Sequence, residues 1–233
     1  TLTKTSFFIS SFFSKHQIKY LILEGVRPNP NLETVYRGLE MAHSFKPDFL
    51  LPIGGGSVID TAKLISVGYY YDGDCFDFNR YLAMPTKGLP IGVILTISAA
   101  GSEMSTSCVI QDDKTLNKSG FNSDFVRPIF AIEDPELTFS VNPAQTGYGI
   151  VDIIMHTLER YLSPSSDNEV ADGLAEGLLR TIIKAGRIVM ENPTDYQARA
   201  TLMLASSLSH NGITSIGKKY SMPVHQLEHA LSG

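Results

Sequence analysis

The 233-residue chain carries 19 basic and 24 acidic residues, a formal net charge of −5, and 43% hydrophobic residues. This balance leaves no basic surface for nucleic acid, and no apolar run approaches the ~20 residues that a membrane span requires. Two cysteines, Cys75 and Cys108, offer neither a disulfide framework nor metal-type spacing. We therefore expect both to be packing residues in a cytoplasmic protein.

The first part of the chain alternates helical and strand-like segments. Apolar residues at helical spacing predict a helix over Ser6–Lys19, and a short strand follows at Tyr20–Leu23. A loop rich in proline and glycine then leads to Asn31, which can cap a second helix over residues 32–45.

The segment Asp48–Ile53 is nearly all apolar, which is typical of a strand in a parallel sheet covered on both faces. It runs directly into Gly54–Ser57 and then into a predicted helix over residues 58–69. A strand, a glycine turn and a helix can cradle phosphate, because free N–H groups and the helix dipole point at the anion. The spacing matches neither G-x-G-x-x-G nor the P-loop pattern. The alternative is a tight turn that needs glycine for its backbone angles and binds nothing.

Further strands are predicted downstream. Residues 89–96 form an apolar strand that leads into a loop of small and hydroxylic residues, 97–103, at the end where open α/β sheets bind ligands. Residues 109–110 and 128–132 indicate two more short strands, joined by the polar segment 111–124.

Beyond residue 142 the sequence has no strand pattern. Three segments have helical periodicity instead: residues 146–162, 168–191 and 194–210. We therefore predict an α/β domain over residues 1–142 and an all-α domain over residues 143–233.

A candidate metal site lies in the predicted helical part. Asp152 and His156 are four residues apart and share one helix face, Glu159 falls on the same side, and far downstream His225 and His229 repeat the spacing. A carboxylate oxygen and imidazole nitrogens that converge form a site for Zn²⁺ or Fe²⁺. The alternative is a solvated polar face. The apolar residues around Asp152 and His156 argue against it, because buried polar groups need partners.

Taken together, these segments resemble the iron-containing, or group III, alcohol dehydrogenases, and most closely their butanol-dehydrogenase-like branch. The resemblance rests on residues 28–30, 54–63, 71–73, 96–103, 134–138, the Asp152/His156/Glu159 helix and 225–232, which follow the family's order over most of the chain. It implies the dehydroquinate synthase-like architecture. In that architecture a Rossmann-like nucleotide-binding domain with a parallel sheet precedes an all-α metal-binding domain, and the metal and nicotinamide occupy the cleft between them.

The resemblance also implies residue roles. A divalent metal, Fe²⁺ or Zn²⁺, would be bound by Asp152, His156 and His225. His229 would be a catalytic residue beside the metal, in a proton relay; the alternative is a hydrogen-bonded cleft residue, and Glu159 would support the site. NAD or NADP would be bound by the remaining positions: Gly55, Gly56 and Ser57 at the pyrophosphate, Asp60 near the nicotinamide, Lys118 near a ribose, and Thr96, Val109 and Leu137 along the rest of the cofactor.

The sequence departs from the family's pattern in three places. The family's fourth metal ligand, a histidine shortly after the segment resembling residues 225–232, has no counterpart, and neither does its opening strand. We therefore expect a chain that is incomplete at both ends. The loop at Ala99–Gly101 also lacks a threonine that some relatives place there.

The implied activity is reversible, metal-dependent and NAD(P)-linked: an alcohol dehydrogenase or aldehyde reductase for small aliphatic substrates such as butanol and butyraldehyde. The family suggests a homodimer or a larger homo-oligomer. Two alternatives stay open. A lyase of the dehydroquinate synthase type would need more basic residues for a phosphorylated substrate than the helical half offers. A non-enzymatic binding or assembly domain is the other.

Overall fold

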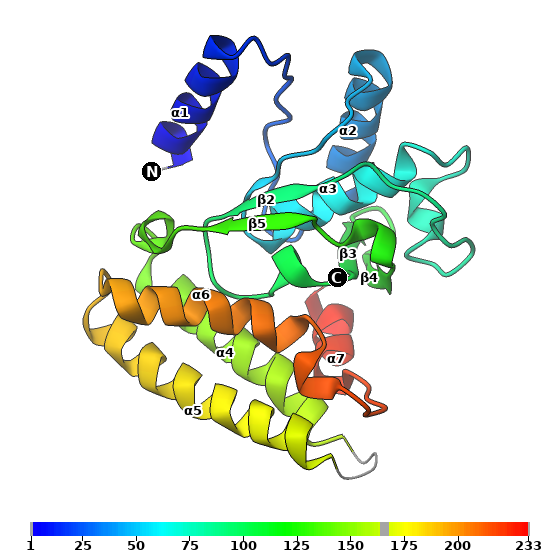
Figure 1. The fold of residues 1–233 in the computed structure, drawn as a ribbon. Coiled ribbons are helices and arrows are strands. Elements are labelled where there is room, and N and C mark those ends of the chain that lie inside the picture. Colours follow the sequence, from blue (N-terminus) through cyan, green and yellow to red (C-terminus); the bar gives the residue numbers. More distant parts are fainter. Residues whose placement is uncertain (1, 164–167, 233) are drawn as a thin grey trace.

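The structure, a computed structural model, describes residues 2–163 and 168–232. An α/β half lies above a bundle of helices (Figure 1). The helices are α1 (Leu2–Lys15), α2 (Leu32–Phe45), α3 (Gly56–Gly68), α4 (Pro143–Tyr161), α5 (Glu169–Glu191), α6 (Tyr196–His210) and α7 (Pro223–Ser232). The strands are β1 (Ile53–Gly54), β2 (Gly92–Leu95), β3 (Ser107–Asp112), β4 (Asn117–Asn122) and β5 (Phe130–Glu133).

A small parallel sheet with the order β1-β2-β5 confirms the predicted sheet type. Strand β2 is buried along its whole length, as its apolar sequence requires. Strand β1 is shorter than the predicted strand over residues 48–53 because Pro52 has no N–H to donate. The pairing nevertheless extends further back, since the N–H of Gly92 donates to the carbonyl of Leu50.

Two local predictions were wrong. The polar segment 111–124 contains strand β4, which pairs with β3 as an antiparallel hairpin separate from the parallel sheet. Phe121 is the one fully buried side chain of β4, so the strand lacks the alternation that would have revealed it. Residues 20–23 form no strand, and Leu21 and Ile22 are exposed.

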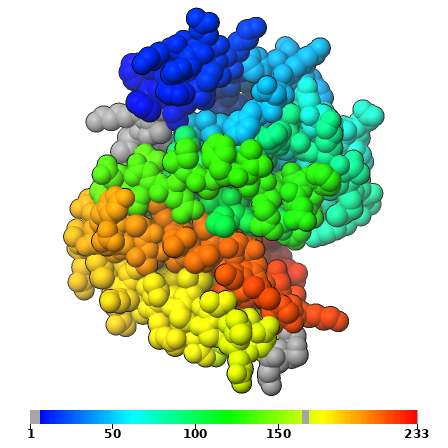
Figure 2. All heavy atoms as spheres, in the orientation of Figure 1, coloured from blue at the N-terminus to red at the C-terminus, as the bar shows by residue number. Residues whose placement is uncertain are grey.

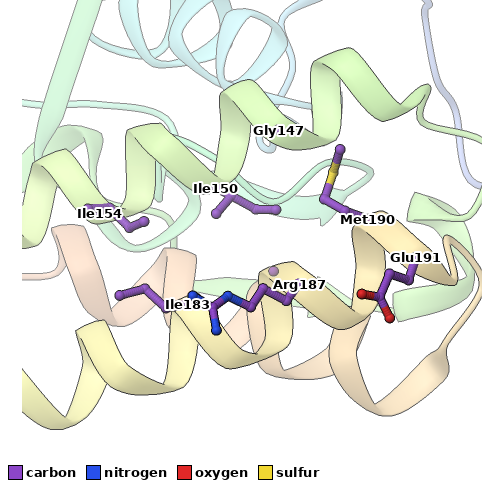
Figure 3. A pocket seen from close by; sticks show the side chains of 8 residues that line it. Gly147, Ile150, Ile154, Ile183, Arg187, Met190 and Glu191 are labelled. Atoms are coloured by element: carbon purple, nitrogen blue, oxygen red, sulfur yellow. The ribbon is translucent and has the colours of Figure 1, made fainter.

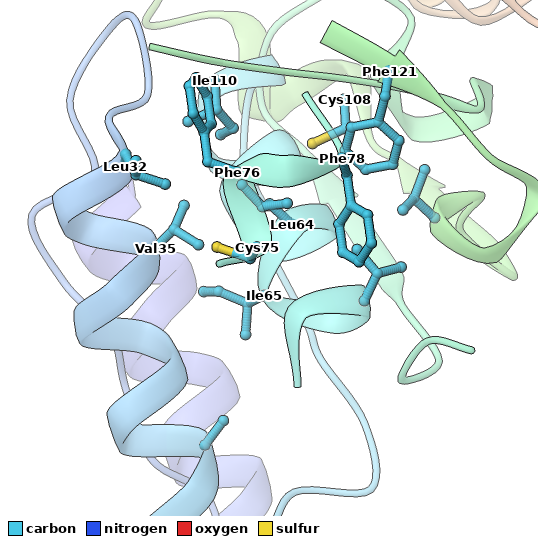
Figure 4. Close-up of a cluster of buried hydrophobic side chains, with 13 residues drawn as sticks. Leu32, Val35, Leu64, Ile65, Cys75, Phe76, Phe78, Cys108, Ile110 and Phe121 are labelled. Atoms are coloured by element: carbon cyan, nitrogen blue, oxygen red, sulfur yellow. The ribbon is translucent and has the colours of Figure 1, made fainter. Parts of the chain in front are cut away.

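The core of the α/β half lies between α2, α3 and the hairpin (Figure 4). Val35, Leu64 and Phe121 are fully buried there. Burial of such apolar side chains contributes roughly 1.5–3 kcal/mol each to stability. Cys75 and Cys108 lie in this core as free, buried thiols, which confirms their predicted packing role.

The three predicted helices of the second half are confirmed as α4, α5 and α6, which lie side by side (Figure 1). Their shared core includes Ile153, Ile182 and Leu202. Within residues 2–163 and 168–232 no strand follows Glu133. None of the helices in these ranges combines the length and apolar character that crossing a membrane requires.

The two halves meet along α6, which contacts β5 of the sheet. Figure 2 shows the orange residues of this region directly below the green ones. Met203 of α6 joins a buried cluster with Ile59 of α3 and Val93 of β2. Ser206 then ties α6 to the loop that follows β2. Its hydroxyl donates to the carbonyl of Ala99 over 3.0 Å and accepts from the N–H of Ala99 over 3.2 Å.

A second polar contact of α6 with the α/β half involves two carboxyl groups, those of Glu103 and Glu133. Ser207 Oγ lies 2.5 Å from Glu103 Oε1 and 2.7 Å from Glu133 Oε1. A hydroxyl has one hydrogen to donate, so both contacts are hydrogen bonds only if one carboxyl carries a proton. Burial raises the pKa of both glutamates, and Glu103, 2% exposed, is the more deeply buried. The raised pKa values of both glutamates favour retention of such a proton, with Ser207 between the two carboxyl groups.

This arrangement predicts a pH-dependent stability term. Because the folded pKa of Glu103 lies above its unfolded value of about 4.3, its contribution to the free energy of unfolding is complete below about pH 4.3 and declines as the pH rises through the folded pKa. The substitution Glu103→Gln keeps a donor toward Ser207 and removes the titration. We expect urea unfolding between about pH 4 and pH 8 to favour the variant increasingly as the pH rises. The exposed Glu136→Gln is the matched control for the substitution itself, and a pH-independent difference for Glu103→Gln would contradict the raised pKa of Glu103.

Candidate metal and nucleotide site

Three side chains with metal-binding groups converge between α4 and α7. Single ligand atoms of Asp152, His156 and His225 all lie within 4.8 Å of one another. Oδ1 of Asp152 is 3.4 Å from His225 Nε2 and 3.8 Å from His156 Nδ1. The two imidazole rings stack with centroids 4.3 Å apart. Helical spacing places Asp152 and His156 on one face of α4, whereas His225 comes from α7.

Glu159 holds His225 from the other side of the ring. Its carboxylate accepts hydrogen bonds from His225 Nδ1 and from the N–H of Val224. Since Nδ1 carries this hydrogen, Nε2 is the nitrogen directed at Asp152. Burial lowers the pKa of His225, but the hydrogen bonds to Asp152 and Glu159 raise it by more, so its pKa lies above the usual value.

The surroundings of His156 fit a metal ligand. Its side chain is buried, and Nδ1 has no hydrogen-bond partner among the described residues. Burial, and then the neighbouring His210, hold the pKa of His156 well below its usual range, so the ring is neutral with a free lone pair. An unpartnered buried nitrogen costs on the order of 1–3 kcal/mol, which a bound cation would offset. One carboxylate and two imidazoles form a donor set that suits Fe²⁺ or Zn²⁺.

His229 lies one turn beyond His225 on α7 and outside the three-residue cluster. Its Nε2 is 3.8 Å from a carboxylate oxygen of Glu228. Burial, and then the charge of Lys118, lower the pKa of His229. The ring is therefore neutral near pH 7 and able to accept a proton.

The glycine turn lies where β1 ends and α3 begins, beside the loop that follows β2. Gly55 is the first residue before α3, and no side chain caps the N-terminus of that helix. A Cβ on Gly55 would stand 2.4 Å from Ile97 Cγ2, so the turn needs glycine for this close approach. The N–H of Thr96 donates to the carbonyl of Gly54, and Gly56 and Ser57 open α3. The structure thus brings Gly55, Gly56, Ser57 and Thr96 to one end of the sheet.

Leu137 lies at the same end of the sheet, in the short helix η4 (Pro135–Thr138) that follows β5. Asp60 is already occupied by protein contacts. Its two carboxylate oxygens accept from the hydroxyl of Ser102 over 2.6 Å and from the N–H of Val109 over 2.9 Å, and burial raises its pKa. Asp60 and Val109 therefore connect α3 to the loop after β2 and to β3.

Lys118 contacts α7. Its Nζ lies 3.0 Å from Glu228 Oε1 and 2.9 Å from Ser232 Oγ. The ammonium group thus joins β4 to the helix that carries His225.

The sequence did not predict two residues that contact the candidate metal ligands. The ring of His210 lies 4.2 Å from the ring of His156, and Arg160 Nη2 lies 3.0 Å from His210 Nδ1. Neither residue belongs to a motif. The available signal was the four-residue spacing between His156 and Arg160 on a predicted helix.

A shallow pocket of about 430 Å³ lies elsewhere, between α4 and α5 (Figure 3). Ile150, Ile154, Ile183 and Met190 give it an apolar lining, with Arg187 at its side. None of the candidate metal or cofactor residues lines it.

Comparisons with known proteins agree with this geometry. Residues 7–135 match the family described as iron-containing alcohol dehydrogenase, and residues 146–233 match the C-terminal part of the Fe-containing alcohol dehydrogenase family. The NADH-dependent butanol dehydrogenase A of Clostridium acetobutylicum is 46% identical over 96% of this chain and 57% of its own length. The NADPH-dependent aldehyde reductase YqhD of Escherichia coli is 34% identical over 89% of this chain and 54% of its own length.

A solved structure of a similar protein has the same fold. That of NADH-dependent butanol dehydrogenase A from Thermotoga maritima superimposes with a TM-score of 0.93 and 39% identity, covering 96% of this chain and 56% of that one. These similarities cover both the α/β half and the helical half of the chain. The chain belongs to the iron-containing alcohol dehydrogenase family, and it spans a little over half the length of the relatives that it matches.

The site depends on a close approach between α4 and the loop after β2, which predicts a strong effect at Gly149. A Cβ there would stand 2.3 Å from the carbonyl oxygen of Ser98, whereas a Cβ on Gly173 of α5 meets nothing within 4 Å. We expect Gly149→Ala to lower the free energy of unfolding by about 1–3 kcal/mol. The matched control Gly173→Ala should raise it by up to ~1 kcal/mol through helix propensity. Urea unfolding measures both, and equal effects would show that the approach is not tight.

Proposed function

We propose that this chain supplies the cofactor-binding and metal-binding core of a NAD(P)-linked alcohol dehydrogenase or aldehyde reductase for small aliphatic substrates such as butanol and butyraldehyde. The observation that carries the proposal is the convergence of Asp152, His156 and His225 from two separate helices. The names of the similar proteins, butanol dehydrogenases and an aldehyde reductase, support the reaction and its substrate class.

The proposed metal ligands are Asp152, His156 and His225, holding Fe²⁺ or Zn²⁺. When bound, the metal supplies a Lewis acid for the substrate oxygen, and NAD or NADP supplies the hydride carrier. Asp152 would contribute negative charge, and His156 and His225 would each contribute one imidazole nitrogen to the metal. Glu159 keeps His225 in the tautomer that leaves Nε2 free for this role.

The proposed cofactor site lies across the ends of the parallel strands. The N–H groups of Gly55, Gly56 and Ser57 at the N-terminus of α3 would bind the pyrophosphate. Further contacts would come from Thr96, Val109, Leu137, Asp60 and Lys118. The division near residue 142 would then separate a cofactor-binding part from a metal-binding part.

His229 is the proposed proton carrier. Its ring is neutral near pH 7 and lies one turn from His225, so it can accept the proton that leaves the substrate hydroxyl during oxidation and return it during reduction. A homodimer or larger assembly and a cytoplasmic location complete the proposal.

The proposal predicts a loss of metal and activity in His156→Ala. We expect metal content, measured by elemental analysis, to fall well below that of the unsubstituted protein, because only Asp152 and His225 remain of the three proposed ligands. Butyraldehyde-dependent NAD(P)H oxidation should fall at least about 100-fold. The exposed His43→Ala is the matched control and should keep both. Normal metal content and turnover in His156→Ala would refute the ligand assignment.

A further inference from the structure

Arg160 is a buried cation in the last turn of α4. It is 2% exposed, and it directs its donors at three acceptors. Nη1 lies 2.7 Å from the carbonyl oxygen of His156 and 2.8 Å from that of Ser209, and Nη2 lies 3.0 Å from His210 Nδ1. The guanidinium therefore links α4, at the backbone of a candidate metal ligand, to the last turn of α6.

These contacts determine the tautomer of His210. A guanidinium can only donate hydrogen bonds and stays charged in proteins, so Nδ1 of His210 must be the acceptor and the ring hydrogen must reside on Nε2. A second proton on the ring would face the charge of Arg160 directly. His210 is therefore held as a neutral imidazole.

The neutral ring of His210 packs on His156. Their centroids are 4.2 Å apart with a tilt of 49°, and the ring of His225 stacks on His156 at 4.3 Å. Three imidazoles thus lie in contact, and two of them belong to the candidate metal cluster. Because His210 stays uncharged, it can pack against His156 without repelling a cation beside it.

Arg160 also contacts the segment that leads to the third ligand. Its Cζ lies 5.0 Å from the ring centroid of Tyr220, three residues before α7 begins. The same guanidinium therefore touches the backbone of His156, the ring that packs on His156, and the approach to the helix that carries His225.

We propose that Arg160 and His210 are positioning residues that fix the ring of His156, and through Tyr220 the start of α7, in the arrangement that binds a divalent cation. This inference rests on the proposed metal site and adds two residues to it. Partners of this kind typically change metal affinity by 10–100-fold when removed.

The test measures Co²⁺ binding to the full chain, because the visible absorption of bound Co²⁺ reports ligand geometry and needs no turnover. We expect His210→Ala to weaken Co²⁺ affinity about 10-fold or more and to change the absorption bands, with circular dichroism unchanged. His210→Phe restores an aromatic ring without the Nδ1 acceptor and should recover part of the affinity. Arg160→Met should weaken binding at least as much, and the Arg160→Met/His210→Phe double variant should cost less than the sum of the single losses.

The controls separate this inference from the metal site itself. Asp152→Ala should abolish saturable Co²⁺ binding, and His43→Ala, on the exposed face of α2, should leave it unchanged. If Asp152→Ala loses binding while folded His210→Ala and Arg160→Met keep both affinity and spectrum, the positioning role is wrong and the metal site stands. If the unsubstituted chain shows no saturable binding that depends on Asp152, both are refuted.

Discussion

The structure depends on the close contact of two helices with one loop. The loop after β2 approaches α4 so closely that Gly149 meets the carbonyl of Ser98, and it is held to α6 by Ser206 and Ser207. This loop continues the strand next to the glycine turn, while α4 carries Asp152 and His156. The contact therefore limits the distance between the proposed cofactor and metal sites, because α4 already touches the loop backbone and α6 cannot shift without breaking buried hydrogen bonds.

Much of the fold could be predicted from local pattern. Asn31 caps α2 as expected, because its side chain accepts from the N–H of Thr34, and the apolar sequence of β2 identified a covered strand. The hairpin strand β4 could not be predicted, because five of its six residues avoid full burial and its pairing with β3 is set by contacts rather than by alternation. Residues 20–23 have strand composition but pair with no strand, so propensity alone misplaced them.

The candidate site likewise contains residues that the sequence predicted and residues that only the fold reveals. Spacing along one helix revealed Asp152 and His156, because such spacing maps directly onto one face. Lys63 carried no comparable signal although it follows the glycine turn: it is fully buried and donates to the carbonyls of Ser105 and Ser107. Only the fold shows that Lys63 joins α3 to the backbone of residues 105–107. Contacts between distant segments, such as Arg160 with His210, are likewise invisible to a one-dimensional pattern.

The buried charges of the chain are arranged so that the carboxylates of Asp152 and Glu159 remain available to His225. Lys63 and Arg160 are the two most deeply buried basic residues among those whose burial is described. Both donate chiefly to backbone carbonyls, with the Ser105 hydroxyl as a further acceptor for Lys63 and the His210 imidazole for Arg160. A guanidinium hydrogen-bonded to Asp152 or Glu159 would neutralise the group that a cation or His225 requires. Carbonyl oxygens accept most of the hydrogen bonds that these two side chains donate, and they add no competing negative charge beside Asp152 or Glu159. Asp152 and Glu159 can therefore act together on His225, one at Nε2 and the other at Nδ1.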